Sequence, residues 1–238
     1  MTRVVVIPAF NAARHIEGVL ERLERLSDWS PTRVIVVNDG STDATRERIL
    51  AARYTRAPLL LVDRAVNGGY GAAMKDGLAA AIQGGAELVA CVHADGQYSP
   101  EALPRLAAAL ERRQLDLLQG SRILSGTAHS GGMPLYKIVA NALLNRIENR
   151  TLGLALTDYH SGYLLYGRRA LELPLHTLSD SFDFDLEVIA CARARGLSVG
   201  EEPIPTHYGD EVSHLEPITY GLRVLRVLWR YWRGHYAA

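Results

Sequence analysis

The stretch from His93 to Gln97 combines three side chains that can bind a metal ion. His93, Asp95 and Gln97 occupy alternate positions after the apolar run 88–92, which is typical of a buried strand. An imidazole, a carboxylate and an amide oxygen bind Mg²⁺ or Mn²⁺ only weakly, so diphosphate oxygens of a substrate would have to complete the coordination shell. The stretch therefore predicts a metal site that forms together with its substrate. The alternative is a surface turn in which Asp95 only caps the next helix.

Three loops that follow predicted strands carry groups suited to a nucleoside diphosphate. They are residues 8–11, 38–43 and 67–71. In the second loop Asp39 can accept a hydrogen bond from a base N–H or a ribose hydroxyl, and Ser41 offers a donor where a helix begins. An ordinary turn that caps this helix explains the same residues. Lys75, one turn into the helix after the third loop, has the charge to meet a phosphate, or it is simply solvated.

The third loop does not match a dinucleotide-binding fingerprint. Gly69 and Gly71 open a helix after a strand, but the sixth position of the motif holds Met74 instead of a glycine or alanine. The motif also normally follows the first strand, not the third. A nicotinamide dehydrogenase is therefore not expected. A close approach of the backbone to a ligand or to a neighbouring helix explains these glycines.

Strands alternate with helices along the first half of the chain. Apolar, β-branched runs predict strands at 3–7, 33–38, 59–63, 88–92 and 116–121, and helical spacing predicts helices at 13–26, 44–54, from 72 to 83, and 100–111. Nearly continuous hydrophobic strands favour a parallel sheet that helices cover on both faces. Ligands of such sheets bind beyond the carboxyl ends of the strands, where the loops above would lie.

The second half departs from this alternation. A long helix is predicted at 135–152 with Leu135, Ile138, Val139, Leu143 and Ile147 toward the core. A loop that enters a strand, a helix at 182–195 and an edge strand at 197–205 are predicted to follow. Three acids begin the helix at 182–195. Asp183, Asp185 and Glu187 are candidate bases for a hydroxyl acceptor. They are equally consistent with a negatively charged first helical turn.

The C-terminal segment 218–232 predicts a basic amphipathic helix. Arginines 223, 226, 230 and 233 share one face, and leucines 222, 225 and 228 with Trp229 and Trp232 fill much of the remainder. Such a helix is typical of one that lies on an anionic membrane surface. The alternative is a terminal helix that packs on the sheet with solvated arginines.

Composition limits the remaining function classes. The 238 residues are 48% hydrophobic with a formal net charge of +0, so no general attraction to nucleic acid is expected. Cys91 and Cys191 are expected to be buried thiols in a reducing compartment. The N-terminus enters a strand without a signal peptide, and no apolar run reaches the roughly 18 residues that span a bilayer. We expect a cytoplasmic protein with peripheral contact to the inner face of the cell membrane.

Several motifs together resemble one enzyme family. The motifs are Pro8-Ala-Phe-Asn11, Val37-Asn-Asp-Gly-Ser-Thr-Asp-Ala-Thr45, Asn67 to Gly77, and His93-Ala-Asp-Gly-Gln97, continued by Gly120-Ser-Arg122, Asp158 to Tyr163 and Glu202 to Pro205. In order and spacing the chain resembles the family 2 inverting glycosyltransferases of GT-A fold, and is most similar to their polyprenol-phosphate (dolichol-phosphate) mannosyl- and glucosyltransferases. The resemblance implies an α/β fold with a mostly parallel, nucleotide-binding sheet flanked by helices and a mixed C-terminal acceptor part.

The resemblance also implies a domain organisation. A catalytic domain would span 1–215, with a donor half at about 1–122 and an acceptor half at about 123–215. A C-terminal amphipathic helix at 216–238 would follow it.

The resemblance implies roles for individual residues. The residues expected to bind the nucleotide sugar are Pro8, Phe10, Asn11, Asp39, Ser41, Asn67, Gly71, Lys75, Ala94, Asp95 and Arg122. Asp95, Arg122 and Asp185 are the expected catalytic residues, and Asp95, Gln97 and His93 the expected metal ligands. Two positions depart from the family, since His93 replaces the first acid of Asp-x-Asp-x-Gln and Asn38 replaces an aspartate. Both changes predict weaker metal binding or an altered metal preference.

The implied reaction is a metal-dependent, inverting hexose transfer. The donor would be a nucleotide-diphosphate sugar of the GDP-mannose or UDP-glucose type, the cofactor Mg²⁺ or Mn²⁺, and the acceptor polyprenyl phosphate. A hydroxyl of a glycan, lipid or small molecule is the alternative acceptor, because the expected acceptor segment 206–215 contains Asp210 and Glu211 where the lipid-phosphate enzymes usually carry basic residues. A nucleotide-binding module without catalysis is the alternative from another class.

Overall fold

The computed structural model describes residues 1–124, 135–205 and 217–237, and for 135–140 and 217–218 it describes the backbone only. The Gly-rich stretch 125–132, between the predicted strand 116–121 and the predicted helix 135–152, lies outside these residues. The acceptor segment expected at 206–215 lies outside them too.

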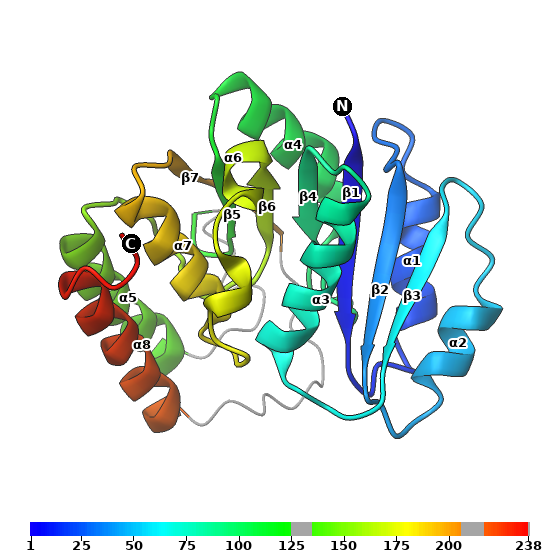
Figure 1. Cartoon of the computed structure of the whole chain (residues 1–238), viewed down its shortest axis with the longest axis horizontal. Helices are drawn as coiled ribbons and strands as arrows, with labels where there is room; N and C mark the ends of the chain where they lie inside the picture. Colours follow the sequence, from blue (N-terminus) through cyan, green and yellow to red (C-terminus); the bar gives the residue numbers. More distant parts are fainter. Residues whose placement is uncertain (125–134, 206–216, 238) are drawn as a thin grey trace.

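One sheet organises the described chain (Figure 1). Its strands are β1 (Arg3–Ala9), β2 (Arg33–Asp39), β3 (Leu59–Arg64), β4 (Leu88–Cys91), β5 (Leu117–Ser121), β6 (Leu164–Gly167) and β7 (Val199–Pro203). Their order is β3-β2-β1-β4-β6-β5-β7. Neighbouring strands are parallel, except that β6 runs antiparallel to both β4 and β5. The predicted mostly parallel sheet and the edge position of β7 are confirmed.

Helices cover both faces of the sheet. They are α1 (Ile16–Glu24), α2 (Thr45–Ala51), α3 (Tyr70–Gln83), α4 (Leu103–Arg112), α5 (Leu135–Leu152), α6 (Arg168–Leu171), α7 (Phe184–Ala194) and α8 (Pro217–Trp232), with 3-10 turns at Pro100–Ala102 and Leu175–Thr177. The sequence predicted neither α6 nor the turn at Leu175. Helix α1 begins three residues later than predicted because the second loop engages the backbone before it: Ala12 N–H donates to Thr45 and Ala13 N–H to Asp43.

Alternate residues of the central strands enter two separate cores. On β1, Val4 and Val6 face the core that contains α3 and α7, while Val5 and Ile7 face the core that contains α1 and α4. All four side chains are at most 1% exposed. Each such burial contributes about 1.5–3 kcal/mol, so a strand of this composition is stable only when both faces are covered.

Helices α5, α7 and α8 lie at the end of the molecule that holds the C-terminus (Figure 1), and α8 contacts both α5 and α7. The inward face of α5 is not the predicted one. Leu143 and Ile147 are 63% and 39% exposed, whereas Asn145, Glu148 and Leu152 are buried. The expectation that Leu143 and Ile147 face the core is therefore wrong.

Candidate active site

The predicted nucleotide loops meet at one edge of the sheet. Ala9, the last residue of β1, is paired with Asn38 near the end of β2. Strands β4 and β5 point the same way because both are antiparallel to β6. The carboxyl ends of these four strands therefore share one edge, which places the loops after β1 and β2, the His93 turn and Arg122 together.

Hydrogen bonds join the first two loops. Asn11 N–H donates to Ser41 Oγ at 3.0 Å, and Thr42 N–H donates to Asn11 Oδ1 at 2.9 Å. Asn11 adopts a positive φ of 50°, a conformation that asparagine tolerates better than most residues. Phe10 is 49% exposed beside this junction, so its ring is accessible to a ligand. Pro8 is half-buried in β1.

Asp39 anchors the third loop. Its carboxylate accepts hydrogen bonds from Gly68 N–H at 2.9 Å and Gly69 N–H at 3.0 Å, and lies 2.8 Å from Arg64 Nε. Asn67 Oδ1 also accepts from Gly69 N–H. A carboxylate has about four lone-pair sites, so Asp39 keeps capacity for one more donor. Asn38 joins the turn to β3, because its side-chain oxygen accepts from Ser41 N–H at 3.3 Å and its amide donates to Asp63 at 2.7 Å.

Two residues expected to bind the donor instead hold the segment before α7. Lys75 Nζ lies 2.9 Å from the Leu178 carbonyl oxygen and 2.6 Å from Asp180 Oδ1. A Cβ on Gly71 would lie 2.2 Å from the Ser179 carbonyl oxygen, so only glycine allows this approach. The close approach predicted for these glycines is confirmed, and it is to protein backbone.

The His93 turn holds the expected metal ligands. Gly96 has a φ of 76°, as the predicted tight bend requires, and Gln97 N–H donates to Asp95 Oδ1 at 2.9 Å. The His93 ring stacks on Tyr70 and has its Nε2 3.1 Å from the Gly162 carbonyl oxygen. In the described ranges no three His, Cys, Asp or Glu side chains gather as a ready metal cage. Asp95 and Gln97 nonetheless supply one carboxylate and one amide oxygen, which suits an ion that substrate oxygens also coordinate.

Asp185 faces the His93 turn from α7. Tyr70 donates its hydroxyl proton to Asp185 Oδ2 at 2.8 Å, while the buried Oδ1 has no hydrogen-bond partner among the described residues. Burial raises the pKa of Asp185 to about 6, although the Tyr70 hydrogen bond and the His93 charge oppose the shift. A carboxylate that titrates near neutral pH and retains an unused oxygen is suited to accept a proton.

Arg122 is held at the end of β5 by a bidentate ion pair. Its Nε lies 2.7 Å from Asp158 Oδ2 and its Nη2 2.9 Å from Asp158 Oδ1. Burial alone would raise the pKa of Asp158, but the charge and hydrogen bonds of Arg122 hold it below its usual range. Nη1 also reaches the Tyr98 hydroxyl, and the Tyr98 ring packs edge-on against His93. Tyr98 thus links Arg122, the residue predicted to contact the diphosphate, to the turn that holds the predicted metal ligands.

The structure adds residues to which sequence reasoning gave no role. Tyr70 and Asp158 each fix a predicted catalytic side chain, and Tyr98 packs between two predicted site residues. Gly162, with a φ of 70°, brings its backbone within reach of His93, which a Cβ would meet at 2.5 Å. Tyr70 and Asp158 do lie inside motifs that the sequence pattern singled out, but no spacing rule pairs them with Asp185 or Arg122.

The other acids of α7 are buried and paired. Asp183 accepts from Ser179 and forms an ion pair with Arg223 at 3.4 Å. Glu187 is fully buried and accepts hydrogen bonds from Arg230 at 2.5 Å and from the Tyr236 hydroxyl at 2.6 Å. Asp185 and Glu187 lie in the first turn of α7 and Asp183 directly precedes it, so the acids do form the negatively charged first turn that was the alternative interpretation.

Helix α8 has two different long faces. The arginine face also serves the interior, because Arg223 and Arg230 form ion pairs with Asp183 and Glu187. On the outer face four apolar side chains are 48% to 76% exposed: Leu222, Leu225, Trp229 and Trp232. Their spacing of three, four and three residues places them in one stripe. Arg226 and Arg233 are exposed beside it, and Arg233 lies over the Trp229 ring at 5.7 Å.

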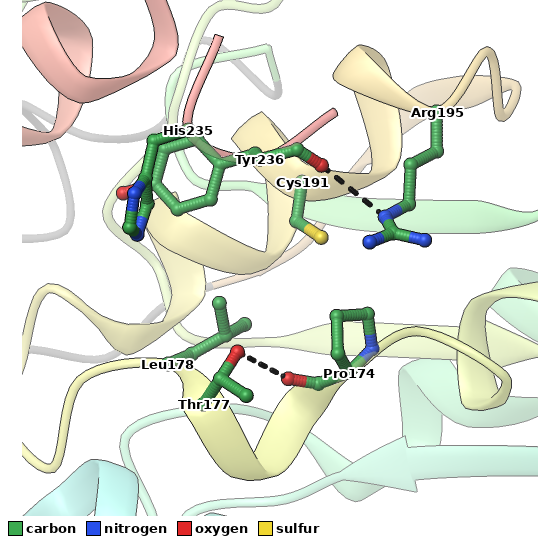
Figure 2. A pocket seen from close by; sticks show the side chains of 7 residues that line it. All are labelled: Pro174, Thr177, Leu178, Cys191, Arg195, His235 and Tyr236. Carbon is green, nitrogen blue, oxygen red and sulfur yellow. Dashed lines mark hydrogen bonds between the residues drawn. The ribbon is translucent and has the colours of Figure 1, made fainter. Parts of the chain in front are cut away.

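A small cavity of about 140 Å³ lies apart from this edge (Figure 2). Residues from the Leu175 turn, α7 and the C-terminal tail line it: Pro174, Thr177, Leu178, Cys191, Arg195, His235 and Tyr236. It shares no lining residue with the predicted site. Both cysteines are buried as predicted, and burial raises the pKa of the Cys191 thiol, which makes this thiol unreactive.

Comparison with known proteins identifies the family. The model of glycosyl transferase family 2 matches residues 4–173. The chain belongs to this family. An undecaprenyl-phosphate mannosyltransferase of Micrococcus luteus is 30% identical over 86% of this chain and 83% of that protein. A UDP-N-acetylglucosamine–dolichyl-phosphate N-acetylglucosaminyltransferase of Methanococcus voltae is 26% identical over 86% of this chain and 85% of its own length.

A solved structure agrees with the fold of this family 2 member. Glucosyl-3-phosphoglycerate synthase from Mycobacterium tuberculosis, in complex with Mn²⁺, uridine diphosphate and phosphoglyceric acid, superposes with a TM-score of 0.73 at 21% identity. The match covers 97% of this chain and 78% of that one. The expected GT-A fold is thereby confirmed. The chain is a glycosyltransferase, and not the non-catalytic module that was the alternative.

Proposed function

We propose that this glycosyltransferase moves a hexose with inversion from a nucleotide-diphosphate sugar to polyprenyl phosphate. The observation that carries the proposal is the position of Arg122, which Asp158 fixes beside the Asp95 and Gln97 turn. One guanidinium and one metal-binding carboxylate at the same edge suit a departing diphosphate. The names of the relatives, which include polyprenyl- and dolichyl-phosphate transferases, support the acceptor.

In this proposal the donor lies across the first three loops. Pro8, Phe10 and Asn11 border the base, and Asp39 with Ser41 bonds the base or the ribose. Asn67 and Gly71 shape the opposite wall, and Lys75 supports that wall through Asp180. Ala94 lies beneath the diphosphate, where a small side chain leaves room.

We propose Asp95 and Gln97 as the protein ligands of Mg²⁺ or Mn²⁺, with diphosphate oxygens completing the shell. When bound, the ion acts as a Lewis acid that stabilises the negative charge of the leaving nucleotide. His93, whose Nε2 faces Gly162, can join these ligands only through Nδ1. Arg122 stabilises the same developing charge, and its ion pair with Asp158 keeps it oriented before the donor binds.

The acceptor decides whether a base is required. A lipid phosphate already carries an anionic oxygen at neutral pH, so that oxygen attacks the anomeric carbon without deprotonation. A hydroxyl acceptor remains the second candidate, because the unpartnered Oδ1 of Asp185 and the raised pKa of this carboxyl suit it as a general base.

The outer stripe of α8 supports a lipid acceptor. We propose that Leu225, Trp229 and Trp232 contact the membrane surface in which the acceptor is anchored, while Arg226 and Arg233 meet anionic headgroups. No helix within the described residues combines the length and the apolar character that a membrane span needs. The contact that we propose is a peripheral one, made by the exposed stripe of α8.

A binding and transfer assay tests the proposal. Nucleotide sugars should raise the melting temperature only when Mn²⁺ or Mg²⁺ is present, because a ligand stabilises the state that binds it. One of them should then donate its sugar to a short polyprenyl phosphate. Asp95→Asn should abolish the metal-dependent shift, whereas Asp28→Asn, at an exposed site, should not. Transfer to a sugar hydroxyl but not to polyprenyl phosphate would refute the proposed acceptor.

A further inference from the structure

Three side chains form a buried connection between α5, the loop before β6 and α8. Glu148 Oε1 lies 3.3 Å from His160 Nε2, and His160 Nδ1 lies 2.8 Å from the Tyr220 hydroxyl. The side chains of Glu148 and His160 are 0% and 8% exposed. None of the roles assigned above uses these residues.

The Glu148 carboxylate has one charge partner among the described residues. Neither of its oxygens makes a hydrogen bond to them, so only His160 can neutralise it there. A buried carboxylate without compensation is costly, and one proton shared by this pair would remove that cost. If Nε2 holds this proton, the ring is an imidazolium and Nδ1 is protonated too. If Glu148 holds it, Nε2 accepts and the neutral ring again carries its proton on Nδ1.

The shared proton therefore sets the direction of the next hydrogen bond. With Nδ1 protonated, His160 donates to the Tyr220 oxygen, and the Tyr220 proton is left to be donated elsewhere. Without the shared proton, Nε2 donates to Glu148, and Tyr220 must donate to Nδ1. Its hydroxyl would then offer only lone pairs to a ligand.

The surroundings of Tyr220 place its hydroxyl in the acceptor half. The backbone N–H of His160 donates to Asp158 Oδ1 at 3.0 Å, so the His160 backbone is bonded to the residue that holds Arg122. Burial raises the pKa of Tyr220, the charges of Glu148, Asp185 and Asp183 raise it further, and the charge of Arg122 lowers it. Glu148 lies on α5, Asp185 on α7, Asp183 directly before α7 and Arg122 directly after β5.

We propose that Tyr220 donates a hydrogen bond to an anionic oxygen of the acceptor phosphate. Glu148 and His160 are positioning residues, because their shared proton keeps the Tyr220 hydroxyl proton directed outward. The inference rests on the proposed function and deepens it, since this arrangement suits an oxyanion better than a neutral hydroxyl that must lose a proton.

Removal of a single oxygen atom tests the contact. Tyr220→Phe keeps the ring packing, and we expect the KM for a short polyprenyl phosphate to rise about tenfold, the usual effect of losing a hydrogen bond to a charged group. The KM for the nucleotide sugar should stay unchanged, and the melting temperature should fall by a few degrees because His160 Nδ1 loses its hydrogen-bond partner. Tyr231→Phe, on the same helix, should change none of these values. Transfer with an unchanged acceptor KM in Tyr220→Phe would overturn the inference and leave the proposed function intact.

The shared proton has a readout that needs no turnover. The ¹⁵N chemical shifts of the His160 ring, assigned by comparison with His160→Gln, should show that Nδ1 is protonated at pH 7 in the wild type. In Glu148→Gln the same shifts should show that Nδ1 is no longer fully protonated. An unprotonated Nδ1 in the wild type would overturn the positioning role. If the wild type transferred no sugar to polyprenyl phosphate, the proposed function and this acceptor contact would both fail.

Discussion

Arg122 is held in one orientation by its partner Asp158. Its guanidinium forms two parallel hydrogen bonds to Asp158 in an almost solvent-free position, with side chains 11% and 1% exposed. A lysine would keep the charge but cannot form this planar fork. The geometry of the pair therefore matters as much as its charge.

Arg122→Lys should lower kcat/KM roughly 100-fold, the order of effect seen when one preorganised donor is lost. Steady-state kinetics with a nucleotide sugar and polyprenyl phosphate would measure it. Arg48→Lys, in an exposed ion pair with Glu17, is the matched control and should retain full activity. Equal activity of both variants would remove Arg122 from the proposed site.

The same pair makes stability depend on pH. The pKa of folded Asp158 lies below the unfolded value of about 3.9, so its ionised form stabilises the fold above that pH. This contribution is lost as the pH falls through the folded pKa. Asp158→Asn should lower the free energy of unfolding by about 3 kcal/mol at pH 7, with a difference from wild type that shrinks toward pH 2. Urea unfolding at several pH values would measure these free energies, with Asp28→Asn as a control. A difference between Asp158→Asn and the wild type that stayed constant with pH would contradict the prediction.

At the scale of elements, α3 depends on a residue without a side chain. Gly71→Ala would place a methyl group 2.2 Å from the Ser179 carbonyl oxygen and should lower the free energy of unfolding by about 1–3 kcal/mol. At Gly18 in α1 an added Cβ would meet no atom within 4 Å, so Gly18→Ala should stabilise by about 0.5–1 kcal/mol. Thermal unfolding of the two variants should therefore shift in opposite directions, and shifts of the same sign would refute the packing argument.

The sequence pattern predicted most elements because their apolar residues follow strand or helix periods. It failed on α5, where the buried side is polar: Asn145 and Asn149 bond the carbonyl oxygens of the 156–157 segment, and Glu148 pairs with His160. A rule that places apolar residues toward the core therefore assigns the wrong face of such a helix to the core. The pattern missed the inward contacts of α8 for a related reason, since Arg223 and Arg230 are attracted by acids that lie about 40 residues earlier.

The site was predictable at the level of loops and less so at the level of contacts. Asn11 and Ser41 meet as expected because parallel strands end together. Lys75 and Gly71 contact the 178–180 segment because α7 packs against the start of α3, and no local pattern reveals that contact. The partners of Asp185 and Arg122 likewise depend on tertiary structure.

At the scale of the whole molecule, α8 gives the enzyme an outward apolar stripe on its acceptor side. We expect the protein to sediment with vesicles that contain anionic lipids. The double variant Trp229→Ala/Trp232→Ala should bind these vesicles at least tenfold more weakly, because two large aromatic anchors are lost. Added salt should weaken wild-type binding, since Arg226 and Arg233 contribute through charge. Leu50→Ala, at an exposed position on α2, should have no effect. Wild-type protein that remained in the supernatant would refute the membrane contact.

The antiparallel strand β6 has a consequence for how the chain is made. Strands β1 to β4 can assemble as soon as they leave the ribosome, but the free side of β4 waits for residues 164–167, some 75 positions later. Strand β5 waits as well, because both of its neighbours, β6 and β7, are synthesised after it. A nascent chain thus carries an open, fully apolar strand edge for several seconds of translation, at the usual 5–20 residues per second. Chaperone capture during synthesis should concentrate in that interval.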